Sequence, residues 1–486
     1  MLAQSNQPCA SEVTSHARFR PLQRPRVTAT QIALLAKSTV VGVGFLFSAQ
    51  LTTSAQTCSW TPAVSGLGCV TSDATATSSI CPSLTIGSCR KITVDHCPSV
   101  EGGTNYLPPR NAFLMIGEPS PGTVEQGTIV LMVGGDGGGW YELASNSPHS
   151  PAVSTPASAD LVKSMQDIGF RTIQIAWDAD VSPASRVPWW ASAAPTPVRQ
   201  EGMLRAACRP ATLFRYLFES PSPSRYFTSG RAFCGAGNSS GAAQLAYSLA
   251  SYGQGGNDPS TGDQKRIFDA VIVSNGPPFS DLFDSCTGSV PTTGPSESDA
   301  NFELVTGTGA GKQGRGSIDY AFGEIGSLGP CYNDPYTPTS ACAPNPPGTC
   351  SSRSSILSDS SIKSSLSNAV FAYPHVSIVA LRAGDWTDKK STYPQCSGNG
   401  NLAPCCPSLS SSQCTASPPV NCCFEGDNEY GSSWSAKQYS DLLAALSGHG
   451  PVDAKLLGDQ EHSIPSRVNG AHAIRDALTA ECHLQQ

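Results

Sequence analysis

Charged residues are scarce in this chain. Asp, Glu, Lys and Arg make up 14% of its 486 residues, and the acidic groups are in excess, with a formal charge of −7 at pH 7. Because nucleic acids and anionic membranes attract basic surfaces, we expect neither as a partner. Cys-x-x-Cys pairs are absent, so clusters such as Cys405-Cys406 and Cys422-Cys423 lack the spacing of a zinc finger. The composition therefore predicts no metal site.

Long apolar runs are missing as well. The longest, residues 38–51, is shorter than the about 20 residues that cross a bilayer as a helix. Basic residues precede it, and the small residues Thr53 and Ala55 follow it, which is the pattern of a secretory signal with its cleavage site. We expect residues 1–55 to be a leader, with no permanent membrane span after cleavage and a secreted, periplasmic or extracellular protein. Because this leader is long, an uncleaved N-terminal anchor is the alternative.

Cysteine, glycine and proline are abundant. The chain has 19 cysteines, of which only Cys9 lies in the leader, so an even number remains for disulfides in an oxidising compartment. With 46 glycines and 39 prolines the chain is rich in loops that such bridges make rigid. We expect a cysteine-rich β lead-in over residues 56–110 and a large domain over residues 111–486. Insertions rich in cysteine are expected at about residues 277–368 and 386–430.

The segment Gly237-Asn238-Ser239-Ser240-Gly241 has the Gly-x-Ser-x-Gly spacing of a nucleophile elbow. An apolar run, residues 231–234, predicts a strand before it, and residues 242–250 predict a helix after it. Ser239 would then sit in a strained turn, where small residues on both sides let strand and helix approach. The same residues match the Asn-x-Ser glycosylation pattern, and we expect this sequon inside an elbow to be unused.

A glycine-rich loop follows the predicted strand at residues 127–133. Its sequence is Gly134-Gly135-Asp136-Gly137-Gly138-Gly139, followed by Trp140 and Tyr141. A backbone without side chains can turn its N–H groups toward a developing alkoxide, and each such donor contributes about 3 kcal/mol to an acyl-transfer transition state. Asp136 is unexpected there, since a carboxylate beside an oxyanion is unfavourable. It is turned away, protonated, or used to bind a polar group of a substrate.

These motifs resemble the α/β-hydrolase superfamily, in which a glycine-rich loop precedes the serine and the catalytic triad follows the order Ser, acid, His. The resemblance implies that Ser239 is the nucleophile, Asp385 the acid and His462 the base. It implies an oxyanion hole formed by backbone N–H groups of Gly135, Asp136, Gly137 and Ser240, and it implies neither a metal nor an organic cofactor.

Other residues compete for two of these roles. His449 and His472 are alternatives for the base, and Asp388, Asp281 and Asp284 are alternatives for the acid. Cys234, on the predicted strand before the elbow, fits a buried or bridged core residue better than a nucleophile.

Strand and helix patterns alternate along the large domain, which predicts a doubly wound, mostly parallel α/β sheet. Strands are expected at residues 90–95, 111–117, 171–177, 268–276, 375–384 and 452–458, and helices at about residues 158–168, 200–218 and 467–482. Trp140, Tyr141 and Trp177 are candidates to line a substrate pocket. The sequence thus predicts a secreted serine hydrolase, foremost one that cleaves carboxylic esters in a small molecule or a polymer. An inactive binding protein with this fold and a secreted serine peptidase are the alternatives.

Overall fold

The computed structural model describes the core of the chain. The described residues are 57–77, 79–81, 87–98, 106–143, 157–182, 188–190, 202–220, 223–256, 266–277, 280, 361–362, 373, 375–383, 395–398, 401–404, 443, 452–457 and 463–483. The predicted leader, most of the two predicted insertions and all cysteines of those insertions except Cys396 lie outside the described residues.

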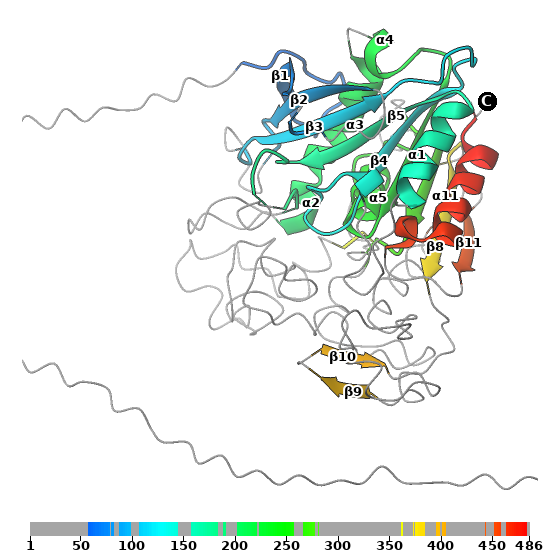
Figure 1. Cartoon of the computed structure of the whole chain (residues 1–486). Coiled ribbons are helices and arrows are strands. Elements are labelled where there is room, and N and C mark those ends of the chain that lie inside the picture. The colour runs from blue at the N-terminus through cyan, green and yellow to red at the C-terminus, as the bar shows by residue number, and fades with distance from the viewer. Residues whose placement is uncertain are drawn as a thin grey trace, which may run out of the picture. The chain divides into compact units, whose positions relative to one another are not determined.

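A nine-stranded sheet forms the centre of the described part, with the strand order β1-β2-β3-β5-β4-β6-β7-β8-β11 (Figure 1). Its strands are β1 (Cys69–Thr75), β2 (Gly87–Asp95), β3 (Arg110–Gly117), β4 (Gly127–Met132), β5 (Phe170–Trp177), β6 (Ala232–Asn238), β7 (Ala270–Ser274), β8 (Ser377–Ala383) and β11 (Val452–Leu457). The pairs from β1 to β5 are antiparallel, and the strands from β5 to β11 in this order run parallel. The predicted mostly parallel sheet is confirmed.

The central strands are buried along their whole length. Every residue of β4, β5, β6 and β7 is buried. Parallel strands that are covered on both faces are continuous apolar runs rather than alternating ones. This is why the sequence patterns at residues 127–133, 171–177 and 268–276 predicted them.

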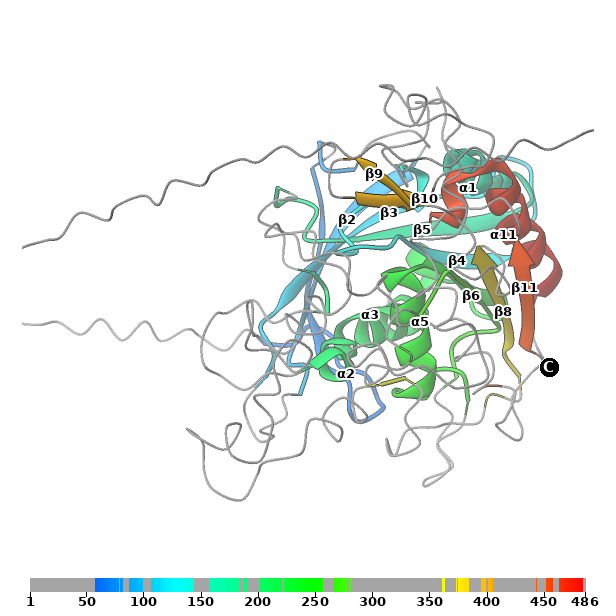
Figure 2. The same ribbon diagram turned by 90° about the horizontal axis from the view of Figure 1, so that it is seen from below.

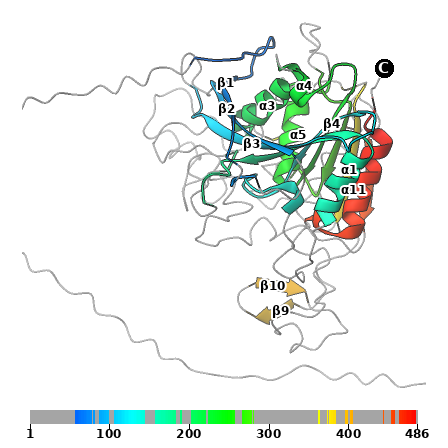
Figure 3. The same ribbon diagram turned by 45° about the horizontal axis from the view of Figure 1, so that its top comes forward.

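Helices cover both faces of the sheet (Figure 2). α1 (Ala157–Asp167) and α11 (Val468–Glu481) lie side by side on one face, as Figure 3 also shows. α3 (Cys208–Glu219) and α5 (Ser240–Ala250) lie against each other on the other face. Val162 and Ile474 belong to the apolar core of the first face, and Phe214 and Leu245 to that of the second. The sheet is therefore doubly wound, as predicted.

One predicted helix is wrong in its extent. The sequence predicted a single helix over residues 200–218, whereas the structure has α2 (Gly202–Ala206) and a separate α3 that starts at Cys208. Pro210 is the reason, because proline has no N–H to donate inside a helix but is tolerated in the first turn. The break at Ala207 places Pro210 in the first turn of α3.

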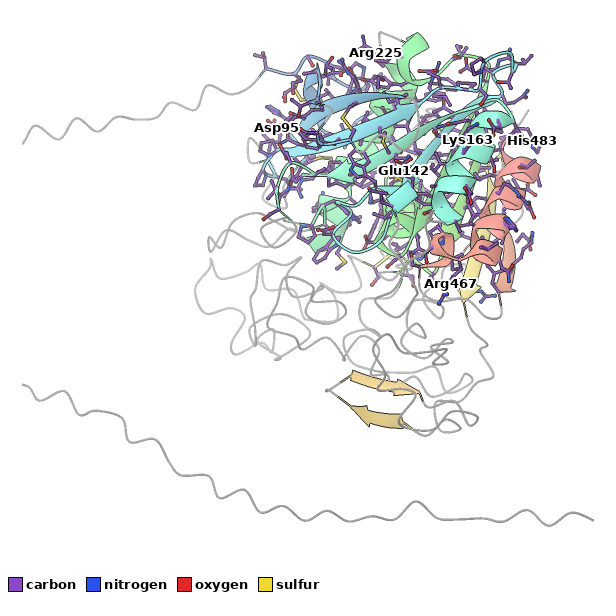
Figure 4. All side chains as sticks on the ribbon, viewed as in Figure 1. Asp95, Glu142, Lys163, Arg225, Arg467 and His483 are labelled. Atoms are coloured by element: carbon purple, nitrogen blue, oxygen red, sulfur yellow. A yellow bond between two sulfur atoms is a disulfide. The ribbon has the colours of Figure 1, made fainter. Side chains whose placement is uncertain are left out.

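Four disulfides lie within the described residues (Figure 4, yellow sulfur bonds). They join Cys58 to Cys69, Cys81 to Cys89, Cys97 to Cys208 and Cys234 to Cys482. The first two are local to the antiparallel edge of the sheet, and the third ties the end of β2 to the start of α3. The fourth confirms that Cys234 is a bridged and fully buried core residue.

Short elements complete the described chain. They are α4 (Pro223–Tyr226), two 3-10 helices (Tyr141–Leu143 and Ile464–Ser466), and a two-stranded hairpin of β9 (Gln395–Gly398) and β10 (Asn401–Pro404). The hairpin falls in the second predicted insertion. Among the described residues, none of the helices has the length and apolar character to cross a membrane.

Candidate active site

Ser239 occupies a sharp turn between β6 and α5. β6 ends at Asn238 and α5 begins at Ser240, so Ser239 is the N-cap residue, with φ of 53° and ψ of −118°. A positive φ strains a residue that carries a side chain. Two backbone hydrogen bonds hold the turn: the Ser239 N–H donates to the Ser274 carbonyl at 2.9 Å, and the Ala243 N–H donates to the Ser239 carbonyl at 3.1 Å.

The two glycines of the motif are required by close packing. A Cβ on Gly237 would lie 2.4 Å from the carbonyl carbon of Gly241, and a Cβ on Gly241 would lie 2.5 Å from the Met132 carbonyl oxygen. Backbone atoms cannot move aside for a side chain at either position. The Gly-x-Ser-x-Gly spacing is therefore the steric condition for bringing β6, α5 and β4 together at Ser239.

Asn238 is buried beside the serine. Its side chain is 3% exposed, and its Oδ1 accepts a hydrogen bond from the Ser274 hydroxyl at 3.0 Å. A glycosylating enzyme cannot reach this side chain in the folded chain, and the expectation that the sequon is unused stays a prediction.

The glycine-rich loop forms a tight turn against the serine. The Gly137 N–H donates to the Gly134 carbonyl at 3.2 Å, and Gly135 and Gly137 both have positive φ. A Cβ on Gly134 would lie 2.8 Å from the Ser239 Cβ and 3.3 Å from its Oγ. The loop therefore passes directly beside the Ser239 side chain, as the sequence predicted.

Each carbonyl of this turn accepts a hydrogen bond. The Gly135 carbonyl accepts from the Ser240 hydroxyl at 2.6 Å and from the Trp190 indole at 3.4 Å. The Asp136 carbonyl accepts from the Trp189 N–H, and the Gly137 carbonyl accepts from the Trp177 N–H at 2.9 Å. The loop is thus fixed by its carbonyl groups.

Asp136 serves its own loop. Its Oδ1 accepts a hydrogen bond from the Gly138 N–H at 2.8 Å, and the residue is partly buried. A carboxylate that caps the following backbone in this way explains why an acidic residue is present in a glycine-rich loop.

The N-terminus of α5 provides the positive end of a dipole at Ser239. The first N–H groups of a helix have no partner within the helix, so they favour an anion placed beside them. Ser240 is the first residue of α5, and its N–H is one of these groups.

The parallel strands end at the same edge of the sheet. Asn238 at the end of β6 pairs with Ser274 of β7, Ser274 pairs with Leu381 of β8, and Ala383 of β8 pairs with Leu457 of β11. The predicted acid, Asp385, comes two residues after β8, and the predicted base, His462, comes five residues after β11. Both lie outside the described residues, as do His449, Asp388, Asp281 and Asp284.

His472 is the only alternative base inside the described ranges. It lies on α11 and is exposed. α11 covers the face of the sheet opposite α5, and nothing in the described residues connects His472 with Ser239.

The predicted pocket aromatics are buried. Trp140, Tyr141 and Trp177 are all less than 9% exposed, and Trp177 has no exposed surface. Burial raises the pKa of the Tyr141 hydroxyl above its ordinary value. Glu142, labelled in Figure 4, follows in the same short helix and accepts a hydrogen bond from Gln174 at 3.0 Å. The role of Trp140, Tyr141 and Trp177 as pocket residues stays a prediction.

Gln244 is a residue that the sequence reasoning missed. It is fully buried on α5, and its Oε1 accepts a hydrogen bond from the Trp177 indole at 2.9 Å. The available signal was its place as a polar residue in the otherwise small and apolar helix Ser240–Ala250, one turn after Ser240.

One cluster in the described part has the composition of a metal site. Cys58, Cys69 and His96 bring their ligand atoms within 4.8 Å of one another. Cys58 and Cys69 are joined in a disulfide, however, so neither offers a thiolate.

No family model matches this chain, and no curated protein sequence matches it. It is similar to solved structures. A carboxyl esterase from Bacillus coagulans is 12% identical, with a TM-score of 0.35 over 80% of this chain and 97% of that one. A siderophore hydrolase from Aspergillus fumigatus is 11% identical, with a TM-score of 0.35 over 76% of this chain and 93% of that one.

A third similar structure is the rice cell wall degrading esterase LipA from Xanthomonas oryzae, in a mutant form. It is 11% identical, with a TM-score of 0.34 over 86% of this chain and 100% of that one. The doubly wound, mostly parallel sheet and the serine in a turn between β6 and α5 are features that the sequence predicted.

Proposed function

We propose that this chain is a serine hydrolase with Ser239 as its nucleophile. The observation that carries the proposal is the Ser239 turn: a serine with φ of 53° at the N-terminus of α5, in contact with a glycine-rich loop. Strain of this kind costs about 1–3 kcal/mol and persists where a function requires it. A structural serine needs neither the strain nor the adjacent loop.

The reaction follows the general scheme of an activated serine. Ser239 Oγ attacks an acyl carbonyl carbon and gives its proton to His462, which passes it to the leaving group as the acyl-enzyme forms. Water then attacks the acyl-enzyme with His462 again as the base. Asp385 holds the imidazole in the required tautomer and stabilises the imidazolium. The support for this assignment is that β6, β8 and β11 end at one edge of the sheet, and Asp385 and His462 follow two of those ends.

The oxyanion would be held by backbone N–H groups on two sides. The Ser240 N–H lies at the start of α5, and the loop supplies the other donor. Gly135 is the best placed of the predicted loop residues, because the Gly137 N–H already donates to the Gly134 carbonyl. In a planar trans peptide that carbonyl points opposite to the Gly135 N–H, which is thereby turned out of the loop. The Asp136 N–H is the remaining candidate, because the Gly137 N–H, which the sequence also suggested, is engaged within the turn.

We propose a carboxylic ester as the substrate, in a small molecule or a polymer, with Trp140, Tyr141 and Trp177 near the acyl or alcohol group. An ester needs less assistance at its leaving group than an amide, so it is the first class to test. The disulfides in the described residues support export, because such bridges persist in oxidising compartments.

The test is labelling of the oxidised full chain with a fluorophosphonate probe, followed by peptide mapping of the adduct. We expect one adduct, on Ser239, and none in Ser239→Ala. A panel of p-nitrophenyl esters of increasing acyl length then defines the substrate. A folded protein that the probe does not modify, or modifies equally in Ser239→Ala, contradicts the proposal.

A further inference from the structure

Two side chains of α5 connect the helix that carries the nucleophile to the glycine-rich loop. They are Ser240 and Gln244, which are four residues apart and therefore lie one turn apart on the same side of the helix. Ser240 acts at the beginning of the loop and Gln244 at its end.

The Ser240 hydroxyl fixes the first part of the loop. It donates to the Gly135 carbonyl at 2.6 Å, and the Ser240 side chain is almost fully buried. Because the peptide is planar, a bond to this carbonyl sets the plane of the Gly135-Asp136 unit. The same residue would offer its own N–H to the oxyanion, so one residue of α5 contacts both halves of the proposed hole.

Gln244 supports the end of the loop through Trp177. The Trp177 indole donates to Gln244 Oε1 at 2.9 Å, and the Trp177 backbone N–H donates to the Gly137 carbonyl at 2.9 Å. The amide of Gln244 also lies directly beneath the loop, because a Cβ on Gly137 would be 3.4 Å from Gln244 Nε2.

Gln244 is a buried polar residue with an unsatisfied donor. It has no exposed surface, and its Nε2 has no hydrogen-bond partner among the described residues. An unsatisfied buried donor costs about 1–3 kcal/mol. A leucine at this position would remove that donor but leave the buried Trp177 indole N–H without an acceptor, at a similar cost, so the Trp177 bond is what the glutamine supplies here.

We propose that Ser240 and Gln244 are positioning residues, whose side chains hold the Gly134–Gly138 loop in register with Ser239 so that its N–H donors meet the oxyanion. The inference depends on the proposed function, since it concerns the same site. Hydrogen-bond donors stabilise the transition state fully only when they are already in position before the reaction begins. If the loop had to reorganise during the reaction, the free energy of that change would offset the hydrogen bond. Loss of either contact should therefore reduce kcat much more than it changes KM.

The experiment compares Ser240→Ala and Gln244→Leu with matched controls in the full, oxidised chain. Ser248→Ala removes another buried serine hydroxyl of α5, which donates to the Gln244 carbonyl and not to the loop. Gln254→Leu removes another buried glutamine, whose Nε2 donates to the Ala211 carbonyl. Ser240→Thr keeps the hydroxyl and serves as the rescue variant.

Two quantities are measured: kcat and KM for p-nitrophenyl butyrate, and the inhibition constant of an aliphatic trifluoromethyl ketone, which forms a tetrahedral oxyanion adduct with a serine. We expect Ser240→Ala and Gln244→Leu to lower kcat about 10- to 100-fold with little change in KM, and to weaken the ketone in proportion. Ser240→Thr should retain most of the activity, and both control variants should keep the kcat of the parent chain.

The inference is wrong if Ser240→Ala and Gln244→Leu keep the parent kcat, or if Ser248→Ala and Gln254→Leu lose as much. It is also wrong if KM rises while the affinity for the ketone is unchanged. Failure of the proposed function has a different signature, because the fluorophosphonate probe would then leave Ser239 unmodified in the parent chain. Circular dichroism of each variant separates a folding defect from a loss of positioning.

Discussion

Cys234 and Cys482 are joined by a disulfide between the strand that leads to the elbow and the end of the C-terminal helix. Cys234 lies on β6, five residues before Ser239, and Cys482 is the C-cap residue of α11. Both cysteines belong to the apolar core under α1 and α11, and the bond closes a loop of sequence separation 248. It ties the elbow strand to the C-terminal helix.

Replacing both cysteines by alanine should reduce the free energy of unfolding strongly. By the chain-entropy relation a loop of this length corresponds to about 5 kcal/mol, against about 3 kcal/mol for the Cys58–Cys69 loop of separation 11. Denaturant unfolding of the two double-alanine variants measures the difference. An equal loss in both would show that strain or residual structure, and not loop length, determines the contribution.

The strain at Ser239 predicts an unusual order of stabilities. Because φ is positive there, Ser239→Gly should be more stable than Ser239→Ala by about 1 kcal/mol, although both lack the nucleophile. At Ser248, in the interior of α5, glycine should instead be less stable than alanine by about 1 kcal/mol. Midpoints of chemical denaturation for the four variants give the comparison, and the same order at both sites would contradict the strained turn.

A methyl group on Gly134 should disturb Ser239, the proposed nucleophile, directly. Its Cβ would lie 2.8 Å from the Ser239 Cβ, so either the loop or the serine must shift, and we expect kcat/KM to fall about 100-fold. Gly139→Ala is the control on the same loop, because its Cβ meets only a Val133 methyl group, at 3.2 Å. Hydrolysis of p-nitrophenyl butyrate by both variants tests this. Similar losses in the two would mean that the loop as a whole, and not the contact at Ser239, is sensitive.

The acid of the proposed triad can be identified by substitution. Asp385→Asn should lower kcat by about 10⁴-fold with the fold intact, because the imidazole of His462 loses the partner that sets its tautomer. Asp388→Asn, three residues further along, should have little effect. The reverse result would identify Asp388 as the acid. Full activity of both variants would leave Asp281 and Asp284 as the candidates.

Asp73 should make stability depend on pH. Burial alone would raise the pKa of this carboxyl, but hydrogen bonds from the hydroxyls of Tyr216 and Tyr226, both at 2.7 Å, and from Arg90 outweigh it and lower the pKa. Because the pKa is lowered in the folded state, the ionised carboxylate stabilises the fold at pH values above its unfolded-state pKa of about 4. This stabilisation is lost as the pH falls through the folded-state pKa. Asp73→Asn should therefore cost about 1–3 kcal/mol at pH 7 and progressively less toward pH 3.

Asp167 is the control for this pH dependence. Its pKa is also lowered, by hydrogen bonds from Lys163 and Ser120, but the group is exposed and solvent screens it, so Asp167→Asn should change stability little. Arg225 on α4 (Figure 4) contacts Asp73 only at 3.5 Å and is 43% exposed, and its removal should also matter little. The measurement is the free energy of unfolding of each variant and of the parent chain between pH 3 and pH 7. If Asp73→Asn were less stable than the parent chain by the same amount at every pH, the charge of Asp73 would not be the cause.

The sequence predicted the buried strands and the turn at Ser239, because each of these has a pattern with a single physical cause. Buried parallel strands are continuous apolar runs, and the elbow glycines are fixed by contacts shorter than a side chain allows, so β4, β6 and Ser239 were found. Apolar periodicity does not indicate the break between α2 and α3, because it continues through Ala207, and only Pro210 marks the interruption. β1 was missed because its residues alternate poorly and its pairing with β2 contains a register shift.

Within the candidate site, the sequence predicted motifs but not the contacts between them. The Ser240 hydroxyl binds the Gly135 carbonyl, which is 105 residues away in the sequence, and the Gln244 amide accepts a bond from the Trp177 indole, 67 residues away; no local pattern indicates either partner. The sequence also does not indicate the role of Asp136, whose carboxylate accepts a hydrogen bond from the Gly138 N–H.

The burial of Asn238 has a consequence for how active protein can be produced. Glycosylation of a secreted chain takes place while the chain is still unfolded, when the Asn-Ser-Ser sequence is as accessible as any other. A glycan attached there has no space between β6 and β7, where the Asn238 amide accepts its bond from Ser274. We therefore expect a chain modified at Asn238 to be unable to form the Ser239 turn, so in a glycosylating host the yield of folded protein would depend on whether folding precedes modification.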